Sequence, residues 1–239
     1  MQCLELTDAD PAHNLACDEA LLDWCEQEEA DAILRIWEPQ SYFVVLGHSN
    51  RIITEVDEAA CAARDISILR RFSGGGAVLQ GPGCLNYALV MKHERSGTFG
   101  DVAGAFRRVL KRHRSLVEKL IAEPVQIEGV SDLAIGGQKF SGNAQHRRHQ
   151  YNLVHGSFLL NFDLALIESC LRMPSRQPAY RQSRSHRSFL RNLFVDSAAV
   201  REGLRREWQI DAEFHAVPFQ RIEELASQRY SSSDWNRKF

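Results

Sequence analysis

The sequence predicts an α+β domain, with strands concentrated in the middle of the chain. Apolar, β-branched runs bounded by turn residues occupy residues 32–92 and 131–162. Apolar residues with helical spacing mark residues 14–25 and 100–121 and the last third of the chain. The 239 residues suffice for one sizeable core, and no repeat or linker divides them. We therefore expect residues 1–239 to form a single domain.

The elements are expected in a simple order along the chain. An amphipathic helix over 14–25 comes first, followed by strands over 32–37 and 42–48 around the turn EPQS, and then by strands over 66–72 and 84–92. A long helix is expected over 100–121, where the apolar residues fall near one face. Strands over 131–145 and 151–162 follow, and then helices over 163–171, 197–208 and 218–229, with a loop over 173–188.

Composition excludes several classes of protein. The chain is 44% hydrophobic and 25% charged, with a net charge of -2, so it is neither disordered nor fibrous, and we expect no nucleic-acid partner. No apolar run approaches the roughly 18 residues of a membrane span. The N-terminus has acidic residues where a signal peptide needs a basic start and an apolar middle. We therefore expect a cytoplasmic protein without a membrane partner.

The six cysteines show neither CxxC spacing nor clustering with histidine, which favours reduced thiols and argues against a metal site. No GxSxG nucleophile motif is present. Cys84 and Cys170 are expected to be small buried apolar residues.

The most unusual segment is RRFSGGGAVLQGPGCLNY, from Arg70 to Tyr87. Three consecutive glycines, Gly74 to Gly76, permit positive φ and let backbone N–H groups approach a ligand closely. Arg70 and Arg71 add donors suited to phosphate or carboxylate. The segment is neither a Walker loop nor a dinucleotide-binding fingerprint. Either it binds an anion, or it is a glycine-rich bulge with solvated arginines.

Two further segments contain candidate site residues. In DLAIGGQKFSGNAQ, Lys139 lies between two glycine sites, in the company of Asp132, Ser141 and Asn143, where its ammonium group suits a phosphate or a developing oxyanion. In VHGSFLL, His155 precedes an apolar strand. Taken alone, a lysine on a strand or a histidine before one is more often structural than functional.

Charge is unevenly distributed. Nine Lys/Arg residues and only two acids lie between Lys139 and Arg191, and the basic tetrad HRRH (146–149) is expected in a hairpin loop. This excess indicates a face that meets an anion or an acidic partner, unless it is an ordinary solvated surface.

Together, these segments resemble the lipoate–protein ligase A catalytic domain, within the biotin/lipoate ligase and octanoyltransferase group. HNLACDEALL, ILRIWEPQSYFVVLGHSN, HGSFLLNFD and IEELASQRYSSSDWN resemble family segments in the same order, so the resemblance spans nearly the whole chain. It implies a mixed, largely antiparallel sheet flanked by helices, like the class II aminoacyl-tRNA synthetase core and biotin ligases. It also implies an enzyme that joins lipoate to AMP, using ATP and Mg²⁺, and then transfers the lipoyl group to a carrier lysine.

The resemblance also assigns site residues. It makes Lys139 the catalytic residue, beside the acyl carbonyl and the phosphate. The residues that it assigns to the acyl-adenylate are Arg70, Arg71, Ser73, Gly74, Gly75, Gly76, Asn86, Asp132, Ser141, Gly142, Ala144, His155 and Gly156. Leu46 and His48 are expected near the apolar tail. Arg147 and Arg148, together with the loop RQPAYRQSRSHR, are expected to dock the carrier beside the mouth of the pocket.

Partners follow from the same resemblance. The carrier would be the lipoyl domain of a dehydrogenase E2 subunit or a protein like the glycine-cleavage H protein; such carriers tend to be acidic. We expect no C-terminal accessory domain, so a separate accessory-domain protein is a further expected partner. Ser131 departs mildly from the family, which often has asparagine at that position.

Three alternatives to a lipoate ligase stay open. An octanoyl- or lipoyltransferase on the same fold would use a cysteine and no ATP. One such subgroup has a cysteine shortly before the DL…GGxK segment, where PVQIEGVSDL has none, so that Cys84 and Cys170 are the remaining candidates. A silent subunit that only docks a carrier is less consistent with Lys139 and the glycine-rich corner. Biotin ligases favour GRGR-type corners.

Overall fold

An eight-stranded sheet forms the centre of the structure, a computed structural model that describes residues 1–93 and 102–239. Its strands lie in the order β11 (Ala212–Glu213), β1 (Gln2–Glu5), β2 (Ile33–Trp37), β6 (Cys84–Lys92), β10 (Tyr151–Leu159), β9 (Gln138–Arg147), β8 (Asp132–Ile135) and β7 (Gln126–Glu128). β1 is parallel to both of its neighbours, and all the other pairs are antiparallel. The prediction of a mixed, largely antiparallel sheet is confirmed.

A second, three-stranded sheet was not predicted. It has the order β4 (Ser67–Arg70), β3 (Phe43–Leu46) and β5 (Val78–Gln80), with β3 parallel to β4 and antiparallel to β5. The strands predicted around the turn EPQS therefore both exist, but they belong to different sheets. All residues of β2 and β3 are buried, so their pattern carried no information about which strands they pair with.

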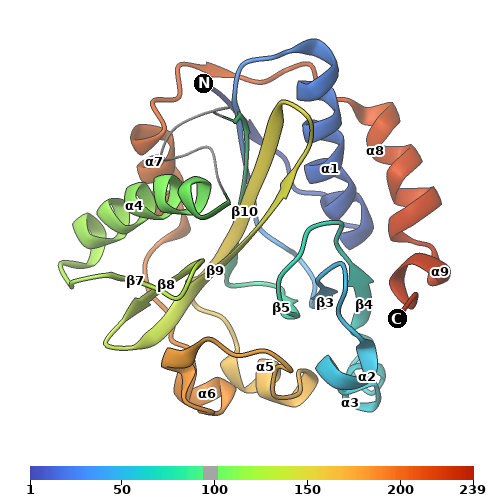
Figure 1. Ribbon diagram of the computed structural model, residues 1–239, viewed down its shortest axis with the longest axis vertical. Coiled ribbons are helices and arrows are strands. Elements are labelled where there is room, and N and C mark those ends of the chain that lie inside the picture. Colours follow the sequence, from blue (N-terminus) through green and yellow to red (C-terminus); the bar gives the residue numbers. More distant parts are fainter. Residues whose placement is uncertain (94–101) are drawn as a thin grey trace.

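Helices flank the large sheet, as predicted. α4 (Val102–Ile121) and α7 (Ser197–Glu207) lie on one side, and α1 (Pro11–Glu28) and α8 (Phe219–Leu225) on the other (Figure 1). Gly100 and Asp101, with which the predicted 100–121 helix begins, lie outside the described residues. No helix in the described ranges has the length and apolarity needed to cross a membrane.

The remaining helices are short. They are α2 (Ile52–Glu55), α3 (Glu58–Ala62), α5 (Leu164–Cys170), a 3₁₀ turn (Ala179–Arg181), α6 (His186–Phe189), a π-helical turn (Ala226–Tyr230) and α9 (Ser233–Asn236). The segment 173–188, predicted to be a loop, therefore contains the 3₁₀ turn and most of α6.

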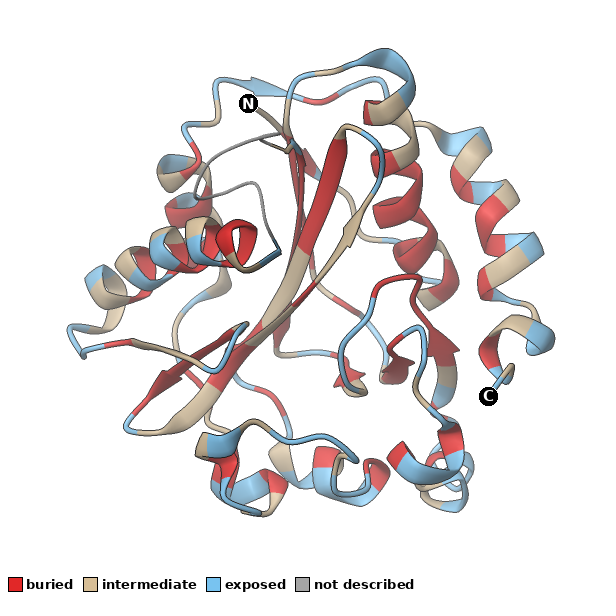
Figure 2. Ribbon diagram, viewed as in Figure 1, coloured by how far each residue is buried: buried red, intermediate tan, exposed pale blue. Residues whose placement is uncertain are grey.

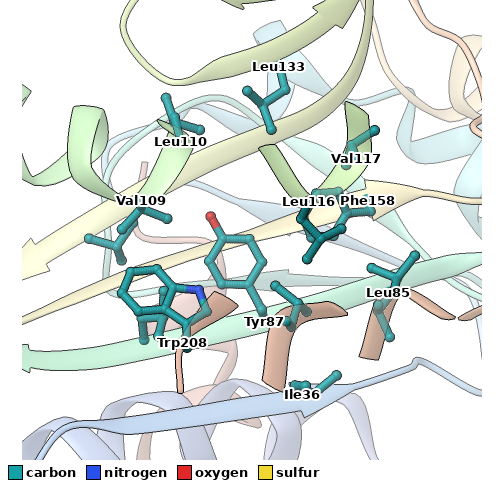
Figure 3. Close-up of a cluster of buried hydrophobic side chains, with 14 of the residues drawn as sticks. Ile36, Leu85, Tyr87, Val109, Leu110, Leu116, Val117, Leu133, Phe158 and Trp208 are labelled. Carbon is teal, nitrogen blue, oxygen red and sulfur yellow. The ribbon is translucent and has the colours of Figure 1, made fainter. Parts of the chain in front are cut away.

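β6 divides the apolar interior between two faces of the large sheet. Leu85, Tyr87 and Leu89 pack with α4 and α7 on one face, and Figure 3 shows Leu85 and Tyr87 in one cluster with labelled residues of α4 such as Val109 and Leu116. Ala88 and Val90 pack with α1 on the other. The buried colouring in Figure 2 follows the strands and the inner sides of the helices. This alternation positions the site, because residues of β6 that face α1 also lie beside the cavity.

Candidate functional site

A cavity of about 400 Å³ lies over the α1-facing side of the large sheet. The smaller sheet contributes Val45 and Val78 to its wall, and residues 130–132 and 171–190 close the other side. Some of the residues that line the cavity are exposed and mark its opening. They include Gly75, Val130 and Arg176. Its apolar wall includes Leu15, Trp37, Val45, Val78, Leu79, Phe140, Leu159, Ile167, Leu171, Phe189 and Leu190.

Strand register brings distant candidates together. Asn86 pairs with Ser157, Ser157 with Gly142, and Gly142 with Asp132, so four strands present one continuous row on the cavity side. Asn86 Nδ2 and, from β9, Ser141 Oγ are buried and have no hydrogen-bond partner among the described residues. Buried polar groups are normally satisfied. These two atoms are therefore available to a polar ligand.

Lys139 and Asp132 form an ion pair in the cavity. Lys139 Nζ is 2.9 Å from Asp132 Oδ1, and the Tyr180 hydroxyl donates to Asp132 Oδ2 at 2.8 Å. A Cβ atom at position 142 would lie 2.6 Å from Lys139 Nζ, so Gly142 leaves the space that this ammonium group occupies. Burial and the neighbouring carboxylate raise the pKa of Tyr180, which remains a hydrogen-bond donor to Asp132.

Arg71 holds the glycine-rich corner together. Its Nη2 donates to the carbonyls of Gly74 at 2.6 Å and Gly76 at 2.9 Å, and burial lowers the pKa of Arg71 to about 10. Gly75 alone of the three glycines has a positive φ, +94°, and a Cβ there would lie 2.8 Å from Arg71 Nη2. The expected need for glycine therefore applies at Gly75, whereas a Cβ at Gly74 or Gly76 would meet no atom within 4 Å.

A chain of hydrogen bonds joins this corner to α1. Arg71 Nε donates to Ser73 Oγ at 3.0 Å, and Ser73 Oγ lies 2.7 Å from His155 Nε2. His155 Nδ1 lies 2.9 Å from Asp18 Oδ2. Arg35 donates to the other oxygen of Asp18 at 2.7 Å. His155, Asp18 and Arg71 line the cavity, whereas Ser73 is buried behind it.

Several residues that were expected to contact the ligand do not line the cavity. Arg70 does not line the cavity; its buried guanidinium donates to the backbone carbonyls of Gly47, Asn50 and Asn236 and so fixes the C-terminal segment. Leu46 is in the apolar core, and His48 lies outside the cavity against Trp235. Their place is taken by Trp37 and the apolar residues of the smaller sheet.

The remaining predicted residues line the cavity or support its wall. Ala144 lines the cavity one step along β9 from the row described above. Gly156 makes room for Asn143, whose Oδ1 would lie 2.0 Å from a Cβ at position 156. Asn143 accepts from the Tyr87 hydroxyl and donates to the Ser131 carbonyl at 2.6 Å. Gly156 and Asn143, which also line the cavity, thus support the β9–β10 pair.

The prediction that the two basic segments, HRRH and RQPAYRQSRSHR, form one docking face is also wrong. Arg147 ends β9, and Arg148 in the following turn lies 2.9 Å from Asp23 Oδ1 of α1. The segment 173–188 lies at the opposite end of β9, where Arg184 donates to the Gly137 carbonyl at 2.9 Å. The eight residue-to-residue steps from 139 to 147 span about 26 Å of strand. Figure 1 shows the β9–β10 turn beside α1 and α6 at the far end.

Sequence reasoning missed some cavity residues, including Asp18, Glu55 and Arg181, and also Tyr180, which does not line the cavity but donates to Asp132. A signal existed for Asp18: Arg35 stands inside the apolar run ILRIW, where a buried cation needs an acid, and Asp18 lies on the helix that precedes it in the chain. Arg181 and Tyr180 were within a segment predicted to be an exposed loop.

No cysteine lines the cavity. All six belong to the described part of the chain, and all are buried. Burial raises the pKa of Cys61 to about 12 and raises that of Cys84 and Cys170 as well. The prediction that Cys84 and Cys170 are buried is confirmed.

Known proteins are similar to this chain over most of its length. Lipoate–protein ligase 1 of Staphylococcus aureus is 28% identical over 231 residues, covering 95% of this chain and 65% of that protein. Octanoyltransferase LipM of Geobacillus kaustophilus is 26% identical over 265 residues, covering 95% of this chain and 94% of that protein. The chain thus spans about two thirds of the Staphylococcus ligase.

Solved structures share the fold. A lipoate-protein ligase A bound with ATP has a TM-score of 0.78 at 24% identity, covering 99% of this chain and 98% of the other. A bi-partite lipoate protein ligase from Thermoplasma acidophilum, described with its E2 lipoyl domain, has a TM-score of 0.79 at 22% identity, covering 99% and 95%. The family model of the lipoyl protein ligase A/B catalytic domain matches residues 10–200, most of the chain. The chain therefore belongs to the lipoyl protein ligase A/B catalytic domain family.

Proposed function

We propose that the chain is the catalytic domain of an ATP-dependent lipoate–protein ligase, which activates lipoate to lipoyl-AMP and transfers the lipoyl group to a carrier lysine. The observation that supports this most is that the cavity contains Lys139 but no thiol from the six described cysteines. Such a cavity suits adenylate chemistry, whereas transfer through a cysteine needs an accessible thiolate.

In the first step, a lipoate carboxylate oxygen attacks the α-phosphorus of MgATP. The bond from that phosphorus to the bridging oxygen of the β-phosphate breaks, and pyrophosphate leaves with the electron pair. Lys139 would stabilise the negative charge that develops on the α-phosphate, as fixed cations do in phosphoryl transfer. Mg²⁺ enters as part of the MgATP substrate.

In the second step, the neutral amine of the carrier lysine attacks the acyl carbon. The new C–N bond replaces the C–O bond to AMP, the amine loses a proton, and AMP leaves. The same ammonium of Lys139 would stabilise the oxyanion. Asn86 Nδ2 and Ser141 Oγ, which lack partners among the described residues, are further candidate donors to the acyl-adenylate.

The apolar wall supports an acyl substrate. Trp37, Val45 and Val78 border the same cavity as Lys139, so a tail on this wall would place its carboxyl end near the cation. A volume of about 400 Å³ is within the usual range for small-molecule sites. The proposed carrier is an E2 lipoyl domain or a protein like the glycine-cleavage H protein, with a separate accessory-domain protein as a further proposed partner.

Octanoyl transfer without ATP is the second candidate, favoured by the similarity to LipM along 94% of that protein. It would need Cys84 or Cys170 to reach the substrate. Both are buried outside the cavity, and burial raises their pKa values, which opposes thiolate formation.

One assay separates the two functions. Purified enzyme is incubated with an apo lipoyl domain, either with lipoate and MgATP or with octanoyl carrier protein and no ATP, and the intact domain is weighed by mass spectrometry. The ligase adds a lipoyl mass only in the first mixture, and also when Cys84 and Cys170 are alanine. Modification that occurs only in the second mixture, and that disappears when Cys84 or Cys170 is replaced by alanine, would establish the transferase instead.

A further inference from the structure

Arg181 is a buried cation at the cavity wall, and the described part of the chain gives it no ion-pair partner. Its side chain belongs to a residue that is 4% exposed, and it lines the cavity. Its Nε donates to the Arg184 carbonyl at 3.1 Å, and its guanidinium carbon lies 4.7 Å from the centre of the Phe189 ring. Among the residues that the structure describes, no carboxylate lies within ion-pair distance of it.

The nearby acids are already engaged. Asp132 binds Lys139 with one oxygen and accepts from Tyr180 with the other. Glu55, also at the cavity, accepts from the Ser175 hydroxyl. A buried arginine without a counter-ion is costly, and burial accordingly lowers the pKa of Arg181. Such a residue is best explained by an anion that enters the cavity.

The backbone around Arg181 is also held in an unusual conformation. Gln182 and Ser183, which follow it directly, both have left-handed φ values, 53° and 56°, although neither is glycine. Arg184 ties the segment to β9 by donating to the Gly137 carbonyl and to the Tyr180 carbonyl. Non-glycine residues in this region cost energy and concentrate at functional sites. The segment therefore fixes Arg181 in place.

The charge of the anion follows from the two half-reactions. Lys139, already compensated by Asp132, faces the single phosphate that both half-reactions share in the proposed mechanism. The triphosphate of ATP carries additional negative charge only before adenylation. The carrier amine, which is a cation until it loses its proton, gains nothing from a second arginine. An extra uncompensated cation is therefore useful mainly in the first half-reaction.

We propose that Arg181 binds the β- and γ-phosphates of ATP and stabilises the departing pyrophosphate. This assignment depends on the proposed ligase function. Exposed Arg172 and Arg176, at the opening of the same cavity, would add a positive field that attracts the nucleotide.

The test compares Arg181→Gln and Arg181→Lys with Arg206→Gln, a control on α7 whose residue is exposed and does not line the cavity. Three quantities are measured: the affinity for inorganic pyrophosphate by calorimetry, lipoate-dependent ATP–pyrophosphate exchange, and transfer from preformed lipoyl-AMP to an apo lipoyl domain. Arg181→Gln should weaken pyrophosphate binding and slow exchange by about tenfold or more, because it removes charge-assisted hydrogen bonds.

Transfer from lipoyl-AMP should stay within about twofold of wild type, Arg181→Lys should recover part of the loss, and Arg206→Gln should change none of the three quantities. Unchanged pyrophosphate affinity in Arg181→Gln would overturn the inference. Equal losses in exchange and transfer would overturn it too, because they indicate a general structural role. If wild-type protein shows no exchange activity, the ligase function is overturned instead. The pyrophosphate affinities of wild type and Arg181→Gln would then still test whether Arg181 binds pyrophosphate.

Discussion

His155 Nε2 lies 2.7 Å from Ser73 Oγ, so a single side-chain contact connects β10 of the large sheet to the glycine-rich corner. With Asp18 on the other side of the imidazole, the distances resemble those of a Ser–His–Asp triad. Ser73, however, is buried behind the cavity, and its oxygen also accepts from Arg71 Nε. The hydrogen bonds that join Arg71, Ser73, His155 and Asp18 therefore form a brace that orients Arg71. They do not form a nucleophile and its base.

The brace predicts the effect of Ser73→Ala. The variant leaves His155 Nε2 without its partner in a largely buried position and removes one of the acceptors of Arg71. We expect the free energy of unfolding to fall by about 1–3 kcal/mol, the usual cost of an unsatisfied buried group. Affinity for a non-hydrolysable lipoyl-AMP analogue should also fall. Denaturant titration and calorimetry measure the two quantities.

Ser227→Ala is the matched control, because its exposed hydroxyl only donates to backbone carbonyls within α8. It should change neither quantity. A Ser73→Ala protein that is as stable as the control and binds the analogue as tightly would show that the brace contributes to neither stability nor binding.

Lys139→Met tests the proposed catalytic role while keeping most of the length of the side chain. Because fixed charge at a developing oxyanion is worth about 10²–10³ in rate, transfer of preformed lipoyl-AMP to the carrier should slow by at least that factor. The Lys139 side chain is 25% exposed, Asp132 is its ion-pair partner among the described residues, and Asp132 keeps the Tyr180 hydroxyl as a donor, so the thermal midpoint should barely move. Single-turnover transfer and thermal melting provide the readouts, and transfer within a few-fold of wild type would contradict the assignment.

Gly75→Val tests the glycine-rich corner. A valine cannot adopt the φ of +94° without strain, and its Cβ would collide with Arg71. We expect binding of the lipoyl-AMP analogue to be abolished. Gly74→Val is the control, because a Cβ at Gly74 meets no atom within 4 Å and Gly74 does not line the cavity. Equal affinity of the two variants would mean that the corner is only a bulge.

Local pattern predicted most of the elements, because strands such as Cys84–Lys92 and helices such as Val102–Ile121 are long and strongly apolar on at least one face. It failed where elements are very short. β5 and β11 have three and two residues, too few for a period, and β7 at the edge of the sheet is only half-buried. Pairing also escaped prediction, since β2 and β3 are close in sequence yet belong to different sheets.

For the site, sequence identified residues that line the cavity but not their partners. Lys139, Asp132 and Asn86 were recognised by resemblance, and strand register explains why they meet. Arg70 was misplaced because two adjacent arginines look alike in sequence, whereas only Arg71, which follows the end of β4, lines the cavity. Arg181 was unpredictable as a cavity residue, since its burial depends on packing against Phe189, which no local pattern encodes.

The last prediction concerns the carrier. Because the two basic segments lie at opposite ends of β9, we propose that the segment 173–188, next to Lys139, docks an acidic carrier, and that Arg148 is engaged with α1. Arg187 is exposed on α6 and outside the cavity. Arg187→Gln should raise the KM for the carrier several-fold at low salt, with ATP–pyrophosphate exchange unchanged, because rim charges mainly steer association. The effect should shrink between about 0.05 and 0.5 M salt, because salt already screens the Arg187 charge in the wild-type protein. Arg148→Gln, which removes a charge already paired with Asp23, should leave that KM unchanged. The opposite ranking of the two variants would return docking to the HRRH turn.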